Sequence, residues 1–181
     1  MHREIIIAGF GGQGVMSMGK ILAYAGMKAG KEISWIPSYG PEMRGGTANC
    51  TVIISDEQIP SPFSDKPDTV IIMNLPSLNK FIDKVKKGGT AIINSSIISK
   101  KIKRNDIDLI KVPANKTAQE LGNSKIMNMV LLGAYLEKIK EIKLSDIEKG
   151  LKEMLPERRH NLIPLNKKAL KKGKEFCTIT Q

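Results

Sequence analysis

The sequence predicts an α/β protein: a three-layer α/β/α single domain with a mostly parallel, mixed sheet and a helical C-terminal third. Short apolar runs alternate with segments of helical periodicity along the first two-thirds of the chain, which is typical of a parallel sheet covered by helices. A glycine-rich turn joins the first apolar run to the first helical segment. Two later strand-like runs follow each other without a crossover helix, so at least one antiparallel pairing is expected. The length of 181 residues suits one domain, 1–181.

The N-terminal elements are predicted from their hydrophobic patterns. The run from Glu4 to Ala8 is typical of a strand covered on both faces. Apolar residues recur at helical spacing from Gly14 to Ala29, and Gly30 ends this helix because glycine readily adopts the left-handed conformation found after helix C-termini. Ile33 to Pro37 and the β-branched run from Thr47 to Ser55 are predicted as the next two strands.

The middle of the chain continues the alternation of strands and helices. Thr69 to Met73 is an apolar strand, and helical spacing from Leu78 to Val85 predicts a helix that ends at the Gly-Gly pair 88–89. Ala91 to Asn94 and Leu109 to Val112 complete the predicted strands.

Three helices are predicted in the last third of the chain. Ser124 is expected to cap the first, and Ser145 with Glu148 forms a capping box for the second, because each side chain can bond the other residue's free amide. Pro164 begins an amphipathic terminal helix. The buried residues of the first helix are predicted to be Met127, Val130, Leu131, Ala134 and Tyr135.

The chain is basic, with a net charge of +11 and a pI near 9.7. The densest lysines, from Lys167 to Lys174, lie on the polar side of the terminal helix, so we expect a solvated face or a face toward an acidic subunit or electron carrier. No aromatic residues interleave with them to stack on bases, so no nucleic acid is expected. The apolar stretch from Ile126 to Leu136 is shorter than the roughly 20 residues that span a bilayer, and nothing resembles a signal peptide, so we expect a cytoplasmic protein without a membrane partner.

The cysteine count excludes several metal sites. Cys50 and Cys177 are the two cysteines, whereas an iron–sulfur cluster needs about four thiolates. Two cysteines and two scattered histidines, His2 and His160, do not have zinc-site spacing either. We therefore expect no metal site, and isolated buried thiols are favoured over a reactive pair.

The first glycine loop is the first candidate site. Gly9, Gly11 and Gly14 satisfy GxGxxG between a strand and a helix, where close backbone approach and free helix N–H groups suit an anion. A dinucleotide site also needs an acid at the end of the second strand, but Glu32 precedes that strand. Three interpretations stay open: a packing joint, a site for a phosphate-bearing ligand shared with other chains, and a self-contained dinucleotide site.

The second candidate site is the loop from Ser38 to Gly46. Gly-Pro and Gly-Gly steps bend it, and Arg44 offers a planar fork of donors that suits carboxylate or phosphate. A binding surface at a strand's carboxyl end, beside the first glycine loop, is the favoured interpretation, and a solvent-facing turn is the alternative.

These loops carry a family resemblance that extends through Val112 to Ala114, Glu120 to Asn123 and Asn128 to Gly133. Together with the string Ser-Tyr-Gly-Pro-Glu-Met-Arg-Gly-Gly-Thr-Ala-Asn-Cys, they resemble the gamma subunit of 2-oxoacid:ferredoxin oxidoreductases. The resemblance covers most of the chain, and the Tyr-Gly-Pro-Glu-Met-Arg-Gly-Gly part is far more specific than GxGxxG.

The resemblance implies one subunit of an enzyme that decarboxylates a 2-oxoacid on thiamine diphosphate, reduces ferredoxin through iron–sulfur clusters and forms an acyl-coenzyme A. It implies alpha and beta partners and a ferredoxin-like delta partner, which hold the thiamine diphosphate, magnesium and clusters. Coenzyme A is the co-substrate, and this chain helps to assemble and shape the site without holding a cofactor alone. No catalytic residue is assigned. The positions that we carry over as cofactor-binding are Gly9, Gly11, Gly12, Gln13, Gly14, Ser38, Tyr39, Gly40, Pro41, Glu42, Met43, Arg44, Gly45 and Gly46.

The second loop also bears on the substrate. It looks closer to the 2-oxoglutarate and branched-chain versions than to the pyruvate version, and 2-oxoglutarate is the preferred expectation. The alternative function is a stand-alone Rossmann-like dinucleotide-binding module.

Overall fold

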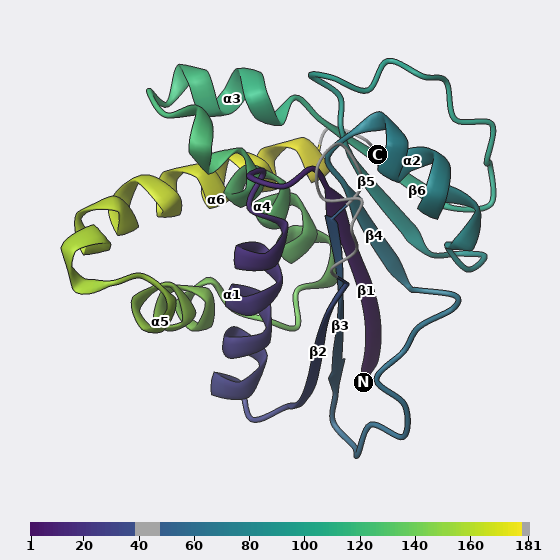
Figure 1. Cartoon of the computed structure of the whole chain (residues 1–181), viewed down its shortest axis with the longest axis horizontal. Coiled ribbons are helices and arrows are strands. Elements are labelled where there is room, and N and C mark those ends of the chain that lie inside the picture. Colours follow the sequence, from purple (N-terminus) through teal and green to yellow (C-terminus); the bar gives the residue numbers. More distant parts are fainter. Residues whose placement is uncertain (39–47, 179–181) are drawn as a thin grey trace.

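The computed structural model describes residues 1–38 and 48–178, and its centre is a six-stranded sheet (Figure 1). The strand order is β2-β3-β1-β4-β5-β6. The strands are β1 (His2–Gly9), β2 (Glu32–Ser38), β3 (Ala48–Ser55), β4 (Thr69–Ile72), β5 (Thr90–Asn94) and β6 (Asp108–Val112).

Strand direction decides where the loops meet. β1, β4, β5 and β6 pair in parallel, whereas β3 is antiparallel to both β1 and β2. The expected mixed sheet is therefore confirmed. Since β3 runs opposite to both of its neighbours, β2 has the same direction as β1. The carboxyl ends of β1 and β2 consequently lie at one edge of the sheet, together with those of β4, β5 and β6.

Helices cover both faces of the sheet, which confirms the three layers and the helical C-terminal third (Figure 1). Side chains alternate along β1, so that Ile5 and Ile7 join the larger core while Ile6 and Ala8 join the smaller one. The larger core packs against α1 (Val15–Lys28), α4 (Met127–Ile139), α5 (Leu144–Met154) and α6 (Ile163–Thr178), and the smaller core packs against α2 (Leu75–Phe81). Among these helices, none is long and apolar enough to cross a membrane.

The pair α4 and α6 crosses at very short range through two glycines. A side chain at Gly133 would collide with the backbone of Leu170, and one at Gly173 would collide with the carbonyl of Val130. The helical third is thus fixed to the larger core by backbone-to-backbone packing.

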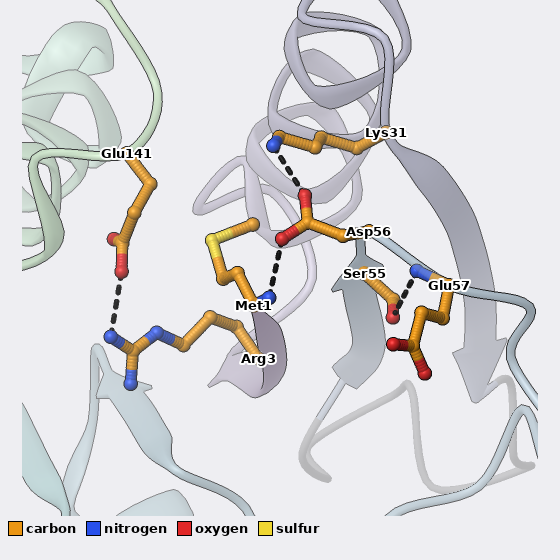
Figure 2. A network of polar contacts seen from close by, with 7 residues as sticks. All are labelled: Met1, Arg3, Lys31, Ser55, Asp56, Glu57 and Glu141. Carbon is orange, nitrogen blue, oxygen red and sulfur yellow. Dashed lines mark hydrogen bonds and ion pairs between the residues drawn. The ribbon is translucent and has the colours of Figure 1, made fainter.

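Polar contacts close the amino edge of the sheet (Figure 2). Figure 2 shows Asp56 between Lys31 and the amino group of Met1, and it bonds both. The hydrogen bond from Lys31, followed by that from the amino group, lowers the pKa of Asp56 to about 2. Arg3 pairs with Glu141 at 2.6 Å, which ties β1 to the turn between α4 and α5.

The predicted capping box at Ser145 and Glu148 is wrong. α5 begins at Leu144, Lys143 is its N-cap, and no side chain of the described chain bonds that end. The physical reason is packing, because Leu144 lies against the larger core. Because Leu144 is partly buried, its packing contributes part of the about 1.5–3 kcal/mol of a fully buried leucine, which is comparable with about 1 kcal/mol for a cap.

The remaining element boundaries also shifted. Ser124 lies inside a 3₁₀ turn, and Asn123 caps that turn by accepting from the N–H of Lys125 at 3.0 Å. The helix predicted from 78 to 85 is α2 followed by a 3₁₀ turn, Ile82–Lys84. Two further elements were not predicted: the seven-residue α3 (Ala114–Glu120), which is too short to show a period, and the 3₁₀ helix Glu157–Leu162 before α6, which begins at Ile163.

Candidate functional site

The two candidate loops start from neighbouring positions at the carboxyl edge of the sheet. Gly9 at the end of β1 pairs with Ala48, and Ser38 at the end of β2 pairs with Asn49. β3 therefore joins the two loops side by side. The structure brings Gly9 to Gly14 and Ser38 together, as the sequence predicts, whereas Tyr39, Gly40, Pro41, Glu42, Met43, Arg44, Gly45 and Gly46 lie outside the described residues.

The glycine loop is closed by its own glutamine. The N–H of Phe10 donates to Oε1 of Gln13 at 2.7 Å, and the N–H of Gln13 donates to the carbonyl of Phe10 at 3.2 Å. Gly12 and Gly14 have φ angles of 88° and 80°, in the left-handed region that favours glycine. The side chain of Gln13 thus stabilises the turn from inside.

The glycines of this loop have different surroundings. A Cβ at Gly9 would lie 2.9 Å from Cβ of Met73 and 3.1 Å from Cγ2 of Val15, so this glycine is required for packing. A Cβ at Gly14 would likewise collide with the side chain of Asn128, whereas a Cβ at Gly12 would meet no atom within 4 Å. The packing interpretation therefore accounts for Gly9 and Gly14, and Gly12 faces open space.

The helix N-terminus is uncapped by side chains of the described residues where this loop enters α1. The N-cap is Gly14, which has no side chain, and no other side chain of the described residues caps the helix. The first N–H groups of α1 therefore lack side-chain partners among those residues. They face a groove of about 260 Å³. That volume fits a phosphate-bearing or carboxylate-bearing group but lies below the roughly 300–1,000 Å³ of whole-ligand pockets. Its lining residues are Phe10, Gly11, Gly12, Gly14, Val15, Met16, Ser17 and Ala48.

The sheet has a topological switch point beside this groove. β1 leads into α1 on one face, and its neighbour β4 leads into α2 on the other face (Figure 1). Ligands of α/β sheets bind in the crevice between such strands. At the end of β4, Asn74 caps α2 by accepting from the N–H of Ser77 at 2.8 Å. The Nδ2 atom of Asn74 and Oγ of Ser77 are buried and have no hydrogen-bond partner among the residues that the structure describes.

Buried asparagines that the sequence analysis missed hold this edge together. Asn128 at the start of α4 donates from Nδ2 to the carbonyl of Gly14 at 3.3 Å, and Asn94 donates to Oδ1 of Asn115 at 2.6 Å. An amide side chain at the end of an otherwise apolar strand or at the start of an apolar helix is the signal that identifies such residues. Their hydrogen bonds fix the positions of the loops at this edge of the sheet.

The described part of the site offers binding groups but no catalytic acid, base or metal cluster. The groove at α1 is lined by residues without titratable side chains, and the described residues include no group of three His, Cys, Asp or Glu that could hold a metal. Cys50 is fully buried, and burial raises the pKa of its thiol to about 12. Cys177 is half-buried, and burial raises its pKa too.

Comparison with known sequences gives relatives over nearly the whole chain. The family Pyruvate ferredoxin/flavodoxin oxidoreductase matches residues 4–176. The 2-oxoglutarate synthase subunit KorC of Methanocaldococcus jannaschii is 33% identical over 172 residues, which are 92% of each chain. The ketoisovalerate oxidoreductase subunit VorA of Methanothermobacter thermautotrophicus is 43% identical over 133 residues, but the match spans 28% of that relative's length.

Solved structures share the fold. The gamma subunit of a keto/oxoacid ferredoxin oxidoreductase from Geobacter sulfurreducens superposes with a TM-score of 0.84 at 29% identity, over 98% of this chain and 99% of that one. The 2-oxoglutarate:ferredoxin oxidoreductase from Magnetococcus marinus, solved with 2-oxoglutarate, coenzyme A and succinyl-CoA bound, gives a TM-score of 0.90 at 25% identity. That match covers 99% of this chain and 32% of the larger one.

Proposed function

Because this chain belongs to the pyruvate ferredoxin/flavodoxin oxidoreductase family, we propose that it is the gamma subunit of a 2-oxoacid:ferredoxin oxidoreductase. The observation that carries the proposal is the match to KorC along 92% of both chains, because the two proteins have the same extent as well as related sequences. The assembled enzyme decarboxylates the 2-oxoacid on thiamine diphosphate and transfers the acyl group to coenzyme A. Two electrons pass to two ferredoxins, each of which takes one, so the products are CO₂, acyl-coenzyme A and reduced ferredoxin.

The role of this chain is to assemble and shape the site with its carboxyl edge. Alpha, beta and ferredoxin-like delta partners hold the thiamine diphosphate, magnesium and iron–sulfur clusters, in agreement with two cysteines in the sequence. The uncapped N-terminus of α1 and the open space at Gly12 suit a phosphate of coenzyme A. The adjacent loop that begins at Ser38 would complete that anion site.

Arg44 gives the sharpest test of this role. We expect its guanidinium to meet a partner carboxylate or a coenzyme A phosphate. Arg44→Ala should change the stability of the free chain by less than about 0.5 kcal/mol, as exposed substitutions usually do. In the assembled enzyme it should weaken subunit association or raise the KM for coenzyme A, and Arg44→Lys should restore only part of the loss because lysine lacks the planar fork. Normal assembly and wild-type kinetics in the alanine variant would show that the loop is a surface turn.

For the substrate we propose 2-oxoglutarate, which gives succinyl-coenzyme A. KorC relatives, named as 2-oxoglutarate synthase subunits, support this choice by matching along 88% and 92% of their own length. VorA supports branched-chain 2-oxoacids as the second candidate by its higher identity over a shorter segment. The complex purified with its own partner chains should have the highest kcat/KM for 2-oxoglutarate when compared with 2-oxoisovalerate and pyruvate. A higher kcat/KM for either of the others would reject 2-oxoglutarate but retain the family role.

A stand-alone dinucleotide module is the alternative function, and the position of Glu32 argues against it. Glu32 begins β2 at the amino edge, whereas Ser38 occupies the carboxyl end where a ribose-binding acid is needed. Calorimetric titration of the free chain with NAD, NADP or FAD should show no binding tighter than about millimolar. A micromolar dissociation constant would favour the module.

A further inference from the structure

A groove with a lysine-rich rim lies beside α2. Figure 1 shows α2 on the face of the sheet opposite α1 and α5. Its volume is about 580 Å³. The floor is apolar and consists of Leu78, Ile82 and Ile102, contributed by α2, the 3₁₀ turn after it and the loop before β6. This loop, residues 95–107, forms one wall of the groove.

Specific contacts fix that loop to α2. Arg104 donates to the carbonyls of Ile82 and Val85 at 3.0 and 2.9 Å, and it pairs with both carboxylate oxygens of Asp106 at 2.7 Å. Lys100 also donates to Oδ1 of Asn79 at 2.7 Å. These hydrogen bonds hold the loop in a fixed position against α2, so the groove is part of the folded structure. Asp106 neutralises the positive charge of Arg104.

The lysines around the groove leave an excess of positive charge. Lys100, Lys101 and Lys103 are exposed on the loop, and Lys80 and Lys84 are exposed beside it with their ammonium groups 5.5 and 5.7 Å from the ring of Phe81. Asp83 also lines the groove and interacts electrostatically with Arg104. The lining of the groove holds four cationic side chains and the two carboxylates of Asp83 and Asp106, which leaves two positive charges, and Lys80 and Lys84 add positive charge nearby.

The composition of the groove indicates the chemistry of its partner. Clustered lysines attract carboxylates from a distance, and lysine is depleted in the cores of permanent interfaces. Small, charge-rich surfaces are typical of weak, rapidly exchanging complexes such as those of electron-transfer proteins. Nucleic acid fits poorly, because no aromatic residue lines the groove and Phe81 is buried, so bases have no face on which to stack.

We propose that this groove docks an acidic electron-carrier protein during turnover of the assembled enzyme. The carrier presents a surface on which carboxylates surround an apolar side chain. The inference rests on the proposed function, since the carrier is the acceptor of that reaction. The groove supplies attraction and orientation only, and the electrons come from the clusters of the partner chains. Lys101 and Lys103 steer the carboxylates, and Ile102 between them contacts the apolar centre.

The test measures ferredoxin binding to the assembled complex directly, without turnover. In the variant Lys84→Gln, Lys101→Gln and Lys103→Gln, the association rate constant at low salt should fall about tenfold, and its salt dependence should flatten. The matched control is Lys66→Gln, Lys143→Gln and Lys152→Gln, which removes the same charge from exposed positions outside the groove and outside α6. It should change the rate constant less than about twofold. If the triple variant fails to assemble, the double variant Lys101→Gln, Lys103→Gln replaces it, because it keeps the contact of Lys84 with Phe81. Its association rate constant should fall about threefold.

Turnover separates docking from catalysis. Reduction of a viologen dye by the groove variant should equal that of the wild type, because a dye needs no docking surface, while the KM for ferredoxin should rise. Equal ferredoxin binding by the groove variant and the wild type, or equal losses in groove and control variants, would overturn the proposal. Loss of binding to single-stranded RNA with ferredoxin binding intact would overturn it in favour of nucleic acid. A wild-type complex without 2-oxoacid-dependent dye reduction would contradict the proposed function, while the ferredoxin titration would still report on the groove.

Discussion

The glycines of the loop from Gly9 to Gly14 serve different purposes, and single substitutions separate them. Gly9→Ala should lower the free energy of unfolding by about 1–3 kcal/mol, because the new methyl group would press on Met73 and Val15. Gly12→Ala should cost about 1–2 kcal/mol through its left-handed backbone alone, since its side chain would meet open space. Urea unfolding of the purified chain measures both effects.

The same two variants locate the ligand in the assembled enzyme. If a phosphate approaches the loop at its open side, Gly12→Ala should raise the KM for coenzyme A more than Gly9→Ala does, despite its smaller effect on stability. An unchanged KM in Gly12→Ala would assign the whole loop to packing.

The two thiols should differ in reactivity. Cys50 is fully buried, with its pKa raised to about 12, so it holds almost no reactive thiolate at neutral pH. Cys177 is half-buried, so an alkylating reagent should label it while Cys50 stays protected. Mass spectrometry after brief alkylation reads the two sites separately, and the unfolded chain, in which both react, is the control. Equal labelling of Cys50 in the native chain would contradict the packing of β3 against α1.

At the scale of elements, the crossing of α4 and α6 is the most sensitive contact to substitution. Gly173→Ala should destabilise the chain by about 3 kcal/mol or more, because its methyl group would collide with the backbone carbonyl of Val130, which cannot rotate away. Ser145→Ala is a useful comparison and should change stability by less than about 0.5 kcal/mol, since Ser145 lies inside α5 and caps nothing in the structure. Denaturant unfolding of both variants checks the pair. A loss of about 1 kcal/mol in Ser145→Ala would restore the capping box.

The elements differ in how well their sequences predict them. β1, β4 and β5 were predictable because strands covered on both faces are continuous apolar runs, and α1 was predictable from its period and from Gly30. Boundaries were less predictable, because a cap contributes only about 1 kcal/mol, which the packing of a partly buried residue such as Leu144 can match. Seven-residue α3 is shorter than the window in which a helical period becomes visible.

At the scale of the molecule, the two candidate loops were predicted to lie side by side, but the strand pairing that places them there could not be predicted. The sequence showed the glycine loop and the loop that begins at Ser38, whereas their proximity depends on β3 running antiparallel between β1 and β2. The contacts of Asn94 and Asn128 could not be assigned from the sequence, because their partners Asn115 and Gly14 are distant in the chain. Asn74 is different, because it caps α2 through Ser77, three residues away.

The whole molecule is proposed to act only within its complex, and one reconstitution measures this most directly. Partner chains purified without this subunit, this chain alone, and the two mixed together are compared for viologen reduction that depends on 2-oxoacid and coenzyme A. We predict no turnover from this chain alone, little from the partners alone, and recovery on mixing. Turnover by the isolated chain, or full activity of the partners in its absence, would contradict the assignment of this chain as a subunit that assembles the site.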